Sequence, residues 1–128
     1  MKSDDRNGER ITDLSYLVSI CGEDHEFKTE MIETFLKNTP PLINDMKNYL
    51  IDSEWKMIGD IAHKMKPSFT FMGIHTAKKL ILNIERQGRL FVDVSEIPTM
   101  VLELESICNE AFAELETELI NVRGSITN

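Results

Sequence analysis

The sequence predicts an all-α protein, an antiparallel four-helix bundle with a short additional N-terminal helix. Apolar residues recur at spacings of three and four along most of the chain, which is the period of helices that bury one face. No run of alternating apolar and polar residues with hairpin turn residues appears in the sequence. Because 128 residues suffice for one domain, we expect a helical domain over residues 11–123, a flexible segment over 1–10 and a tail over 124–128.

The first predicted helix is short and covers about residues 12–20, with Thr12 or Asp13 as its N-cap and Gly22 just past its end. Asp24 is placed to cap a long second helix. The apolar face of that helix holds Phe27, Met31, Phe35, Ile43, Met46 and Leu50.

Two adjacent prolines, Pro40 and Pro41, interrupt the second helix. Because proline lacks an amide donor and crowds the preceding turn, we expect either a kink or a restart of the helix with Thr39 as its cap. Ser53 then opens a third helix. Its apolar stripe consists of Trp55, Ile58, Ala62, Met65, Phe69 and Met72.

Two further helices complete the predicted bundle. Gly73 ends the third helix, and a fourth runs over about residues 75–87 until Gly88 stops it. Its apolar face holds Ala77, Leu80, Ile81 and Ile84. The last helix covers about residues 95–122 and has the strictest apolar spacing of the chain, in Ile97, Val101, Leu104, Cys108, Ala111, Leu115, Leu119 and Val122.

Charge and apolar content exclude several classes of protein. A formal net charge of −8 disfavours nucleic acid as a partner. The longest apolar runs are far shorter than the roughly 20 residues of a membrane span, and residues 1–10 lack the apolar region of a signal peptide. We therefore expect no nucleic acid and no membrane as partners, and a cytoplasmic location. Cys21 and Cys108 lie in apolar patterns without CxxC spacing, which favours buried free thiols over a disulfide or a metal site.

His63 is the residue that the helical scaffold does not require. If Ala62 and Met65 point inward, His63 points to the rim or to solvent, and Lys66 lies about 60° away on the next turn. A lone outward histidine is most often an ordinary surface residue. Here His63 shares its helix with Lys64 and Lys66 on an otherwise acidic chain. This combination suggests that the imidazole is built to carry a negatively charged group.

The chain resembles the histidine-containing phosphotransfer (HPt) domain family. In that family a Lys follows the phosphorylated His by three residues, a small-residue stretch comes next, and a Gly and a Gln or Glu follow at ten and twenty-two residues. The corresponding positions here are His63, Lys66, Ser68, Gly73 and Glu85. The resemblance covers the helical layout from about residue 12 to residue 122, and it implies that the His63 imidazole is hydrogen-bonded to the Glu85 side chain.

One departure from the family pattern concerns docking. Family members commonly have Gly directly after the Lys, where this chain has Pro67, and that proline should bend the helix within a turn of His63. The resemblance implies that a partner domain docks around this helix. We expect the docking surface to include Lys56, Asp60, Pro67, Thr70, Phe71 and Gly73.

The chemistry of a histidine phosphocarrier sets requirements that can be matched to residues. An imidazole in water has a pKa of about 6.5, so a ring nitrogen is free for attack at neutral pH. Glu85 would fix the tautomer and favour positive charge on the ring, while Lys66, and secondarily Lys64, would meet the phosphoryl oxygens. Alternatively, Lys66, Lys64 and Glu85 are ordinary surface charges.

Two function classes stay open at this point. In the first, His63 accepts a phosphoryl group from a receiver-domain aspartate of a hybrid sensor kinase and passes it to an aspartate of a response regulator. In the second, the bundle docks a receiver domain or another partner without chemistry. No ATP-binding or kinase motif occurs, so we expect a carrier and not an enzyme, with no cofactor of its own and with Mg²⁺ in the partner receiver domain. His25 and His75 show no ligand spacing with His63, so we expect no metal site, and we expect a monomer.

Overall fold

The computed structural model describes residues 10–127, which are all-helical and contain no strand. The expected flexible segment at 1–10 lies, except for Arg10, outside the described residues. The elements are α1 (Ser15–Cys21), α2 (His25–Ile51), α3 (Trp55–Phe71), the 3-10 turn η1 (His75–Ala77), α4 (Lys78–Leu90), the 3-10 turn η2 (Val94–Glu96) and α5 (Ile97–Thr127).

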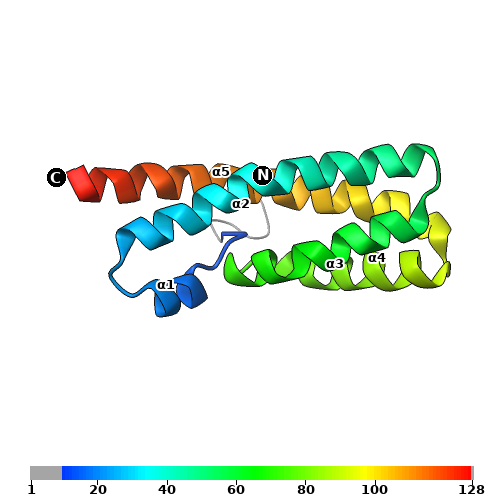
Figure 1. Ribbon diagram of the computed structural model, residues 1–128, viewed down its shortest axis with the longest axis horizontal. Coiled ribbons are helices and arrows are strands. Elements are labelled where there is room, and N and C mark those ends of the chain that lie inside the picture. The colour runs from blue at the N-terminus through cyan, green and yellow to red at the C-terminus, as the bar shows by residue number, and fades with distance from the viewer. Residues whose placement is uncertain (1–9, 128) are drawn as a thin grey trace.

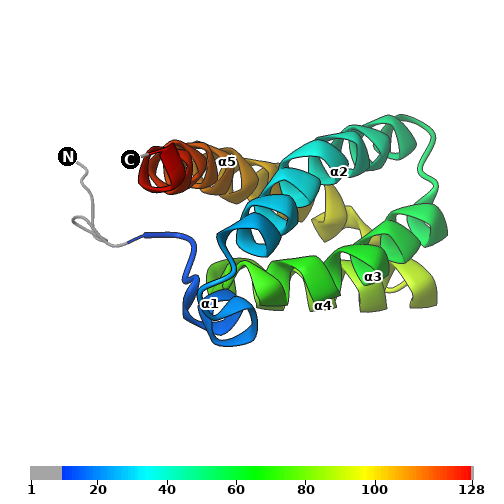
Figure 2. The ribbon, with the colours of Figure 1, turned by 60° about the vertical axis from the view of Figure 1, so that its left-hand side comes forward.

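The four long helices pack in pairs. Figure 1 shows α2 beside α5 and α3 beside α4, with α1 next to the beginning of α2. The turned view in Figure 2 shows the same pairs as two layers, one of α2 and α5 and the other of α3 and α4. The most extensive contacts are those between α3 and α4, the two helices that also contain the segment around His63 and Glu85.

The core is built from one apolar stripe on each long helix. All eight apolar positions predicted on the last helix, from Ile97 to Val122, are buried, so that prediction is confirmed. α5 continues to Thr127, and residues 124–127, expected as a tail, are therefore helical. Cys21 and Cys108 are buried free thiols, as the sequence predicts, and burial raises the pKa of Cys108 to about 12.

α2 confirms its predicted cap but not its predicted interruption. The Asp24 carboxylate accepts a hydrogen bond from the Phe27 amide at 2.9 Å. The helix then runs without a break through Pro40 and Pro41, so the expected restart at Thr39 is wrong. Thr39 itself is buried within a stripe that also holds Ile32, Phe35, Ile43 and Met46. The burial of apolar side chains before and after the prolines stabilises the helix and offsets the missing amide hydrogen bonds. Phe27 lies outside this stripe and is exposed, against expectation.

The connection after α3 explains why Gly73 is a glycine. Gly73 has a φ of +63°, and a Cβ atom there would lie 1.9 Å from the carbonyl oxygen of Asp13. The Asp13 amide donates to the carbonyl oxygen of Met72 at 3.2 Å, so the chain before α1 runs directly against this connection. The Asp13 carboxylate also accepts from the amide of Ser15, where α1 begins.

Gly88 does not end the fourth helix, as the sequence had suggested. α4 continues to Leu90, and Phe91 closes it in the left-handed conformation. Gly88 is buried against α3, where a Cβ atom would lie 2.5 Å from the carbonyl oxygen of Trp55. Its small size therefore serves the close approach of two helices and not a turn. The helix also begins later than predicted, because residues 75–77 form the 3-10 turn η1.

Candidate functional site

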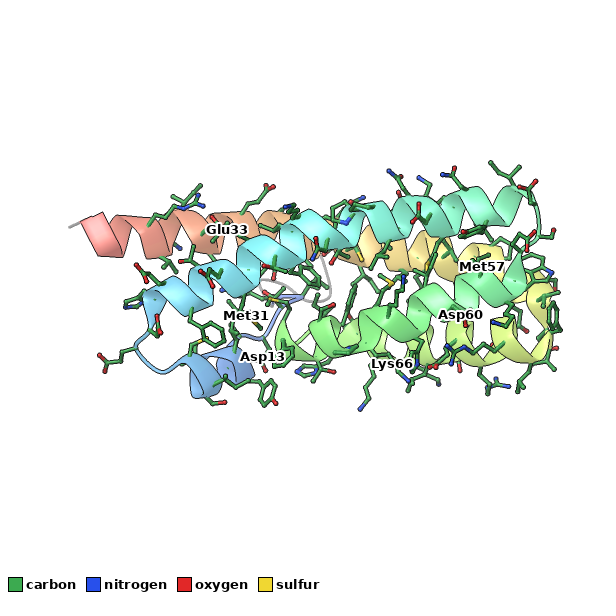
Figure 3. All side chains as sticks on the ribbon, in the orientation of Figure 1. Asp13, Met31, Glu33, Met57, Asp60 and Lys66 are labelled. Carbon is green, nitrogen blue, oxygen red and sulfur yellow. The ribbon has the colours of Figure 1, made fainter. Side chains whose placement is uncertain are left out.

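α3 presents His63 on its outer side. Ala62 and Met65 are fully buried, as the stripe requires, and the His63 side chain is 54% exposed. Lys66 lies one turn further on and is partly exposed. Figure 3 labels Asp60 and Lys66 on α3, along the side of that helix that lies next to α4. The imidazole therefore has solvent on one side and a neighbouring helix on the other.

Glu85 on α4 joins His63 to Lys66. Its Oε2 atom lies 2.7 Å from His63 Nδ1, and its Oε1 atom accepts a hydrogen bond from Lys66 Nζ at 2.8 Å. Gly59 permits this proximity, because a Cβ atom there would lie only 3.0 Å from the Glu85 carbonyl oxygen. The Glu85 side chain is only 14% exposed, so it is held between the two helices.

The protonation of the Glu85 carboxyl group decides which tautomer of the imidazole fits. The hydrogen bond from Lys66 lowers the pKa of Glu85 below its ordinary value of 4.5. Burial opposes this effect, and the bond with His63 reinforces it. An ionised carboxylate has no proton to donate at neutral pH, so His63 Nδ1 carries the hydrogen and donates it. In the neutral form of this tautomer the other ring nitrogen, Nε2, has a free lone pair.

Arg89 belongs to the site, although the sequence analysis did not single it out. Its Nη1 atom donates to Glu85 Oε2 at 3.0 Å, and its Nε atom donates to Asp60 Oδ1 at 2.8 Å. Asp60 Oδ2 in turn accepts from Lys56 Nζ at 3.0 Å. The signal in the sequence was the spacing of four between Glu85 and Arg89, which places both side chains on one face of α4.

The same chain of charges affects Asp60. The hydrogen bond from Lys56, followed by that from Arg89, lowers the pKa of Asp60. The carboxylates of Glu85 and Asp60, with the guanidinium group of Arg89 between them, therefore connect two lysines along the seam between α3 and α4. Lys66 lies at one end of this network and Lys56 at the other. Lys56 and Asp60, which the sequence analysis assigned to docking, belong to this network.

Lys64 does not join this cluster in the structure. It lines a groove between α2 and α3, together with Phe71 and with Leu42 of α2. The Phe71 ring stacks on Tyr16 of α1, with ring centroids 5.6 Å apart. The two lysines that the sequence placed beside His63 thus lie on different sides of α3.

The remaining residues of the expected docking surface differ in exposure. Pro67 and Thr70 are exposed, and α3 continues through Pro67 to Phe71. The Thr70 hydroxyl donates to the carbonyl oxygen of Lys66 at 3.1 Å. Gly73 is buried against Asp13, so it shapes the connection after α3 and offers no surface of its own.

Two other features are absent from the described residues, a cluster of metal ligands and a membrane-spanning helix. Within residues 10–127 no three or more His, Cys, Asp or Glu side chains gather as they would around a metal ion. No helix in this described range combines the length and the apolar character needed to cross a membrane.

Comparison with known proteins gives no assignment. No protein-family model, no curated protein and no solved structure matches the chain. The cluster of His63, Lys66, Glu85, Arg89 and Asp60 is therefore the feature of the chain that bears on its function.

Proposed function

We propose that the protein is a histidine phosphocarrier of a multi-step two-component phosphorelay, similar to HPt domains, with His63 as the phosphorylated residue. The observation that carries the proposal is the 2.7 Å contact between His63 Nδ1 and an ionised Glu85, which leaves Nε2 as the free nitrogen on an exposed side chain. An ordinary surface histidine has no need of a partly buried carboxylate that fixes its tautomer.

The transfer step can be written with these groups. His63 Nε2 attacks the phosphorus of an aspartyl phosphate on a receiver domain, an N–P bond forms, and the P–O bond to the aspartate breaks to release its carboxylate. The imidazole becomes positively charged, which the Glu85 carboxylate on Nδ1 stabilises. The reverse step delivers the phosphoryl group to a second receiver aspartate. Mg²⁺ in the receiver domain supplies further charge stabilisation.

Lys66 is the cation available to the transferred phosphoryl oxygens. Its ammonium group has three hydrogens and uses one of them on Glu85 Oε1, which leaves two for oxygens that arrive at Nε2 of His63. Its side chain is 36% exposed and therefore in contact with solvent. Arg89 has a positioning role in this proposal, because its Nη1 and Nε atoms hold Glu85 and Asp60.

The proposal includes the arrangement of the scaffold. Short connections join α2 to α3 and α4 to α5. α2 also packs against α5. An antiparallel four-helix bundle accounts for both facts. We place this single domain over residues 11–123 of a monomeric cytoplasmic protein, whose partners are the receiver domain of a hybrid sensor kinase and that of a response regulator.

Transfer of label tests the proposal directly. The protein is incubated with a receiver domain that carries ³²P on its aspartate and, separately, with phosphoramidate as a small donor. We expect acid-labile, base-stable phosphate on the wild type and none at this site in His63→Gln. His75→Gln is the matched control, because His75 is also exposed, at 73%, but has no contact with Glu85. A folded wild type that gains no label from either donor would leave only a binding module that docks without chemistry.

A further inference from the structure

A hollow lies between α3 and α4 beside Lys66, and none of the functions above uses it. Its volume is about 200 Å³. The buried side chains of Phe69, Ile74 and Ile81 form its floor, and the half-exposed Leu82 forms one wall. Most of the lining is therefore apolar. An apolar cavity of about 150 Å³ accommodates benzene, so this hollow has room for a body of one or two rings.

The polar part of the lining is cationic. Lys66 and Lys78 line the hollow together with His75, and no carboxylate lines it, although the chain as a whole has a net charge of −8. Lys78 is exposed at the first residue of α4, where the positive end of the helix dipole adds to its charge. Lys66 reaches the hollow from α3, the helix on which Figure 3 labels it next to α4.

We propose that this hollow binds a small amphipathic anion, namely an aromatic carboxylate whose ring lies on Phe69, Ile74 and Ile81 and whose carboxylate meets Lys78 and Lys66. The apolar floor disfavours a bare phosphate, which would lose its hydration there without gaining hydrogen bonds. The size of the hollow disfavours a peptide. An apolar body with one anionic group satisfies both the floor and the rim.

The site has a consequence for Lys66. The ammonium group of Lys66 donates one hydrogen to Glu85 Oε1, and a carboxylate in the hollow takes another of its hydrogens. A ligand therefore occupies a donor of Lys66 that the phosphoryl oxygens at His63 would otherwise use. This consequence rests on the proposed function, whereas the binding itself does not.

Binding is tested on the full chain without any phosphoryl transfer. The probe is 2-naphthoate, and 2-naphthalenemethanol serves as a neutral molecule with the same rings. We expect saturable shifts of the amide resonances of Thr70, Lys78 and Leu82 in ¹⁵N spectra, with naphthoate bound more tightly than the alcohol. Lys78→Gln should weaken naphthoate binding about two- to fivefold, while Lys79→Gln should leave it unchanged, because Lys79 is exposed but does not line the hollow.

A second variant tests the site in case Lys78→Gln changes naphthoate binding only slightly. Leu82→Asp removes an apolar wall and adds a carboxylate to the rim, and its 42% exposure indicates that the fold tolerates the change. We expect this variant to lose saturable naphthoate binding. The proposal is overturned if the wild type does not saturate, if Leu82→Asp binds as the wild type does, or if the shifts map to other elements. Equal affinity for the acid and the alcohol would overturn the role of the cations.

The coupling to Lys66 has its own measurement. Once binding is established, saturating naphthoate should slow the uptake of label by wild-type protein and leave the rate of Leu82→Asp unchanged. Unaltered uptake in the wild type would reject the coupling and leave the binding site in place. Absence of label at His63 without ligand would reject the phosphocarrier function and leave the binding result standing.

Discussion

At the scale of single residues, Glu85 is the centre of the candidate site. Its two carboxylate oxygens accept from Lys66, Arg89 and the His63 ring, so one partly buried group orients three side chains. Because these partners are cations or become cationic, the arrangement gains most when the imidazole carries positive charge. This is the state that a phosphorylated histidine reaches.

The role of Lys66 can be separated from that of its neighbour Lys64. Lys66→Ala should slow label transfer by roughly tenfold, because the transferred oxygens lose the cation that we assign to them. The free energy of unfolding should change by less than about 1 kcal/mol, since Lys66 is partly exposed and Glu85 keeps its hydrogen bonds with His63 and Arg89. Transfer kinetics and urea unfolding measure the two effects. Lys64→Ala is the matched control, because Lys64 lines the groove on the α2 side. Equal rates for both variants would show that Lys66 has no part in transfer.

At the scale of elements, the spacing between α3 and α4 determines the site. Gly59 and Gly88 lie at the contact between these helices, and each has backbone of the other helix where a Cβ atom would be. The contact between His63 and Glu85 spans the same seam. A change in the helix spacing therefore acts on the site without touching a charged residue.

Gly88→Ala should reveal this dependence. A Cβ atom 2.5 Å from the Trp55 carbonyl oxygen forces the helices apart, so we expect a loss of about 1–3 kcal/mol in the free energy of unfolding and slower label transfer at His63. Gly124→Ala on α5 is the control, because nothing lies within 4 Å of its Cβ position. Unfolding in urea and transfer rates are measured for both. A stable Gly88→Ala protein with wild-type rates would contradict the close packing.

The apolar stripe of α5 supports a second prediction at this scale. Leu104→Ala should lower the free energy of unfolding by about 2–5 kcal/mol, through lost burial and the cavity left behind. Leu102→Ala, two residues away and 57% exposed, should change it far less. Urea unfolding of the two variants compares a core and a surface leucine on one helix. A loss below about 0.5 kcal/mol for Leu104→Ala would mean that this stripe is not the core.

These elements show which parts could be predicted from the sequence. The stripe of α5 and the cap at Asp24 depend on local spacing, and both were predicted correctly. The prediction that Gly88 ends α4 was wrong, because this position needs a small residue for the close approach of Trp55 on α3, which local spacing does not reveal. α2 continues through Pro40 and Pro41, against the expected restart, because side-chain packing outweighs the lost backbone hydrogen bonds.

The candidate site was predictable to a similar extent. The resemblance to the HPt family implied the contact between His63 and Glu85, which the structure contains, whereas the roles of both residues stay predictions. The spacing of four between Glu85 and Arg89 could have indicated their contact. The contact of Arg89 with Asp60 could not be predicted, because it joins two helices through side-chain conformations that no spacing specifies.

At the scale of the whole molecule, Glu114 of α5 ties the segment before α1 to the helical core. Its carboxylate accepts hydrogen bonds from the amide of Ile11, from the amide of Thr12 and from the Thr12 hydroxyl, at 2.7–2.9 Å. The segment thus held leads through Asp13 to the connection at Gly73. One side chain therefore joins the beginning of the described chain to α5 and, through that chain, to the end of α3.

The pH dependence of stability tests this link. Partial burial tends to raise the pKa of Glu114, but hydrogen bonds from Ile11 and Thr12 outweigh it, so the pKa lies below its ordinary value of 4.5. A carboxyl group whose pKa is lower in the folded state stabilises the protein at pH values above the pKa of the unfolded state, and this stabilisation is lost as the pH falls through the pKa of the folded state.

Glu114→Gln should therefore lower the free energy of unfolding by about 1–3 kcal/mol at pH 7, and the difference from wild type should shrink below about pH 4.5. Urea unfolding from pH 7 to pH 3 measures both quantities, with Glu116→Gln as the control because Glu116 is exposed on the same helix. A difference that stays constant down to pH 3 would show that the Glu114 charge does not hold the segment.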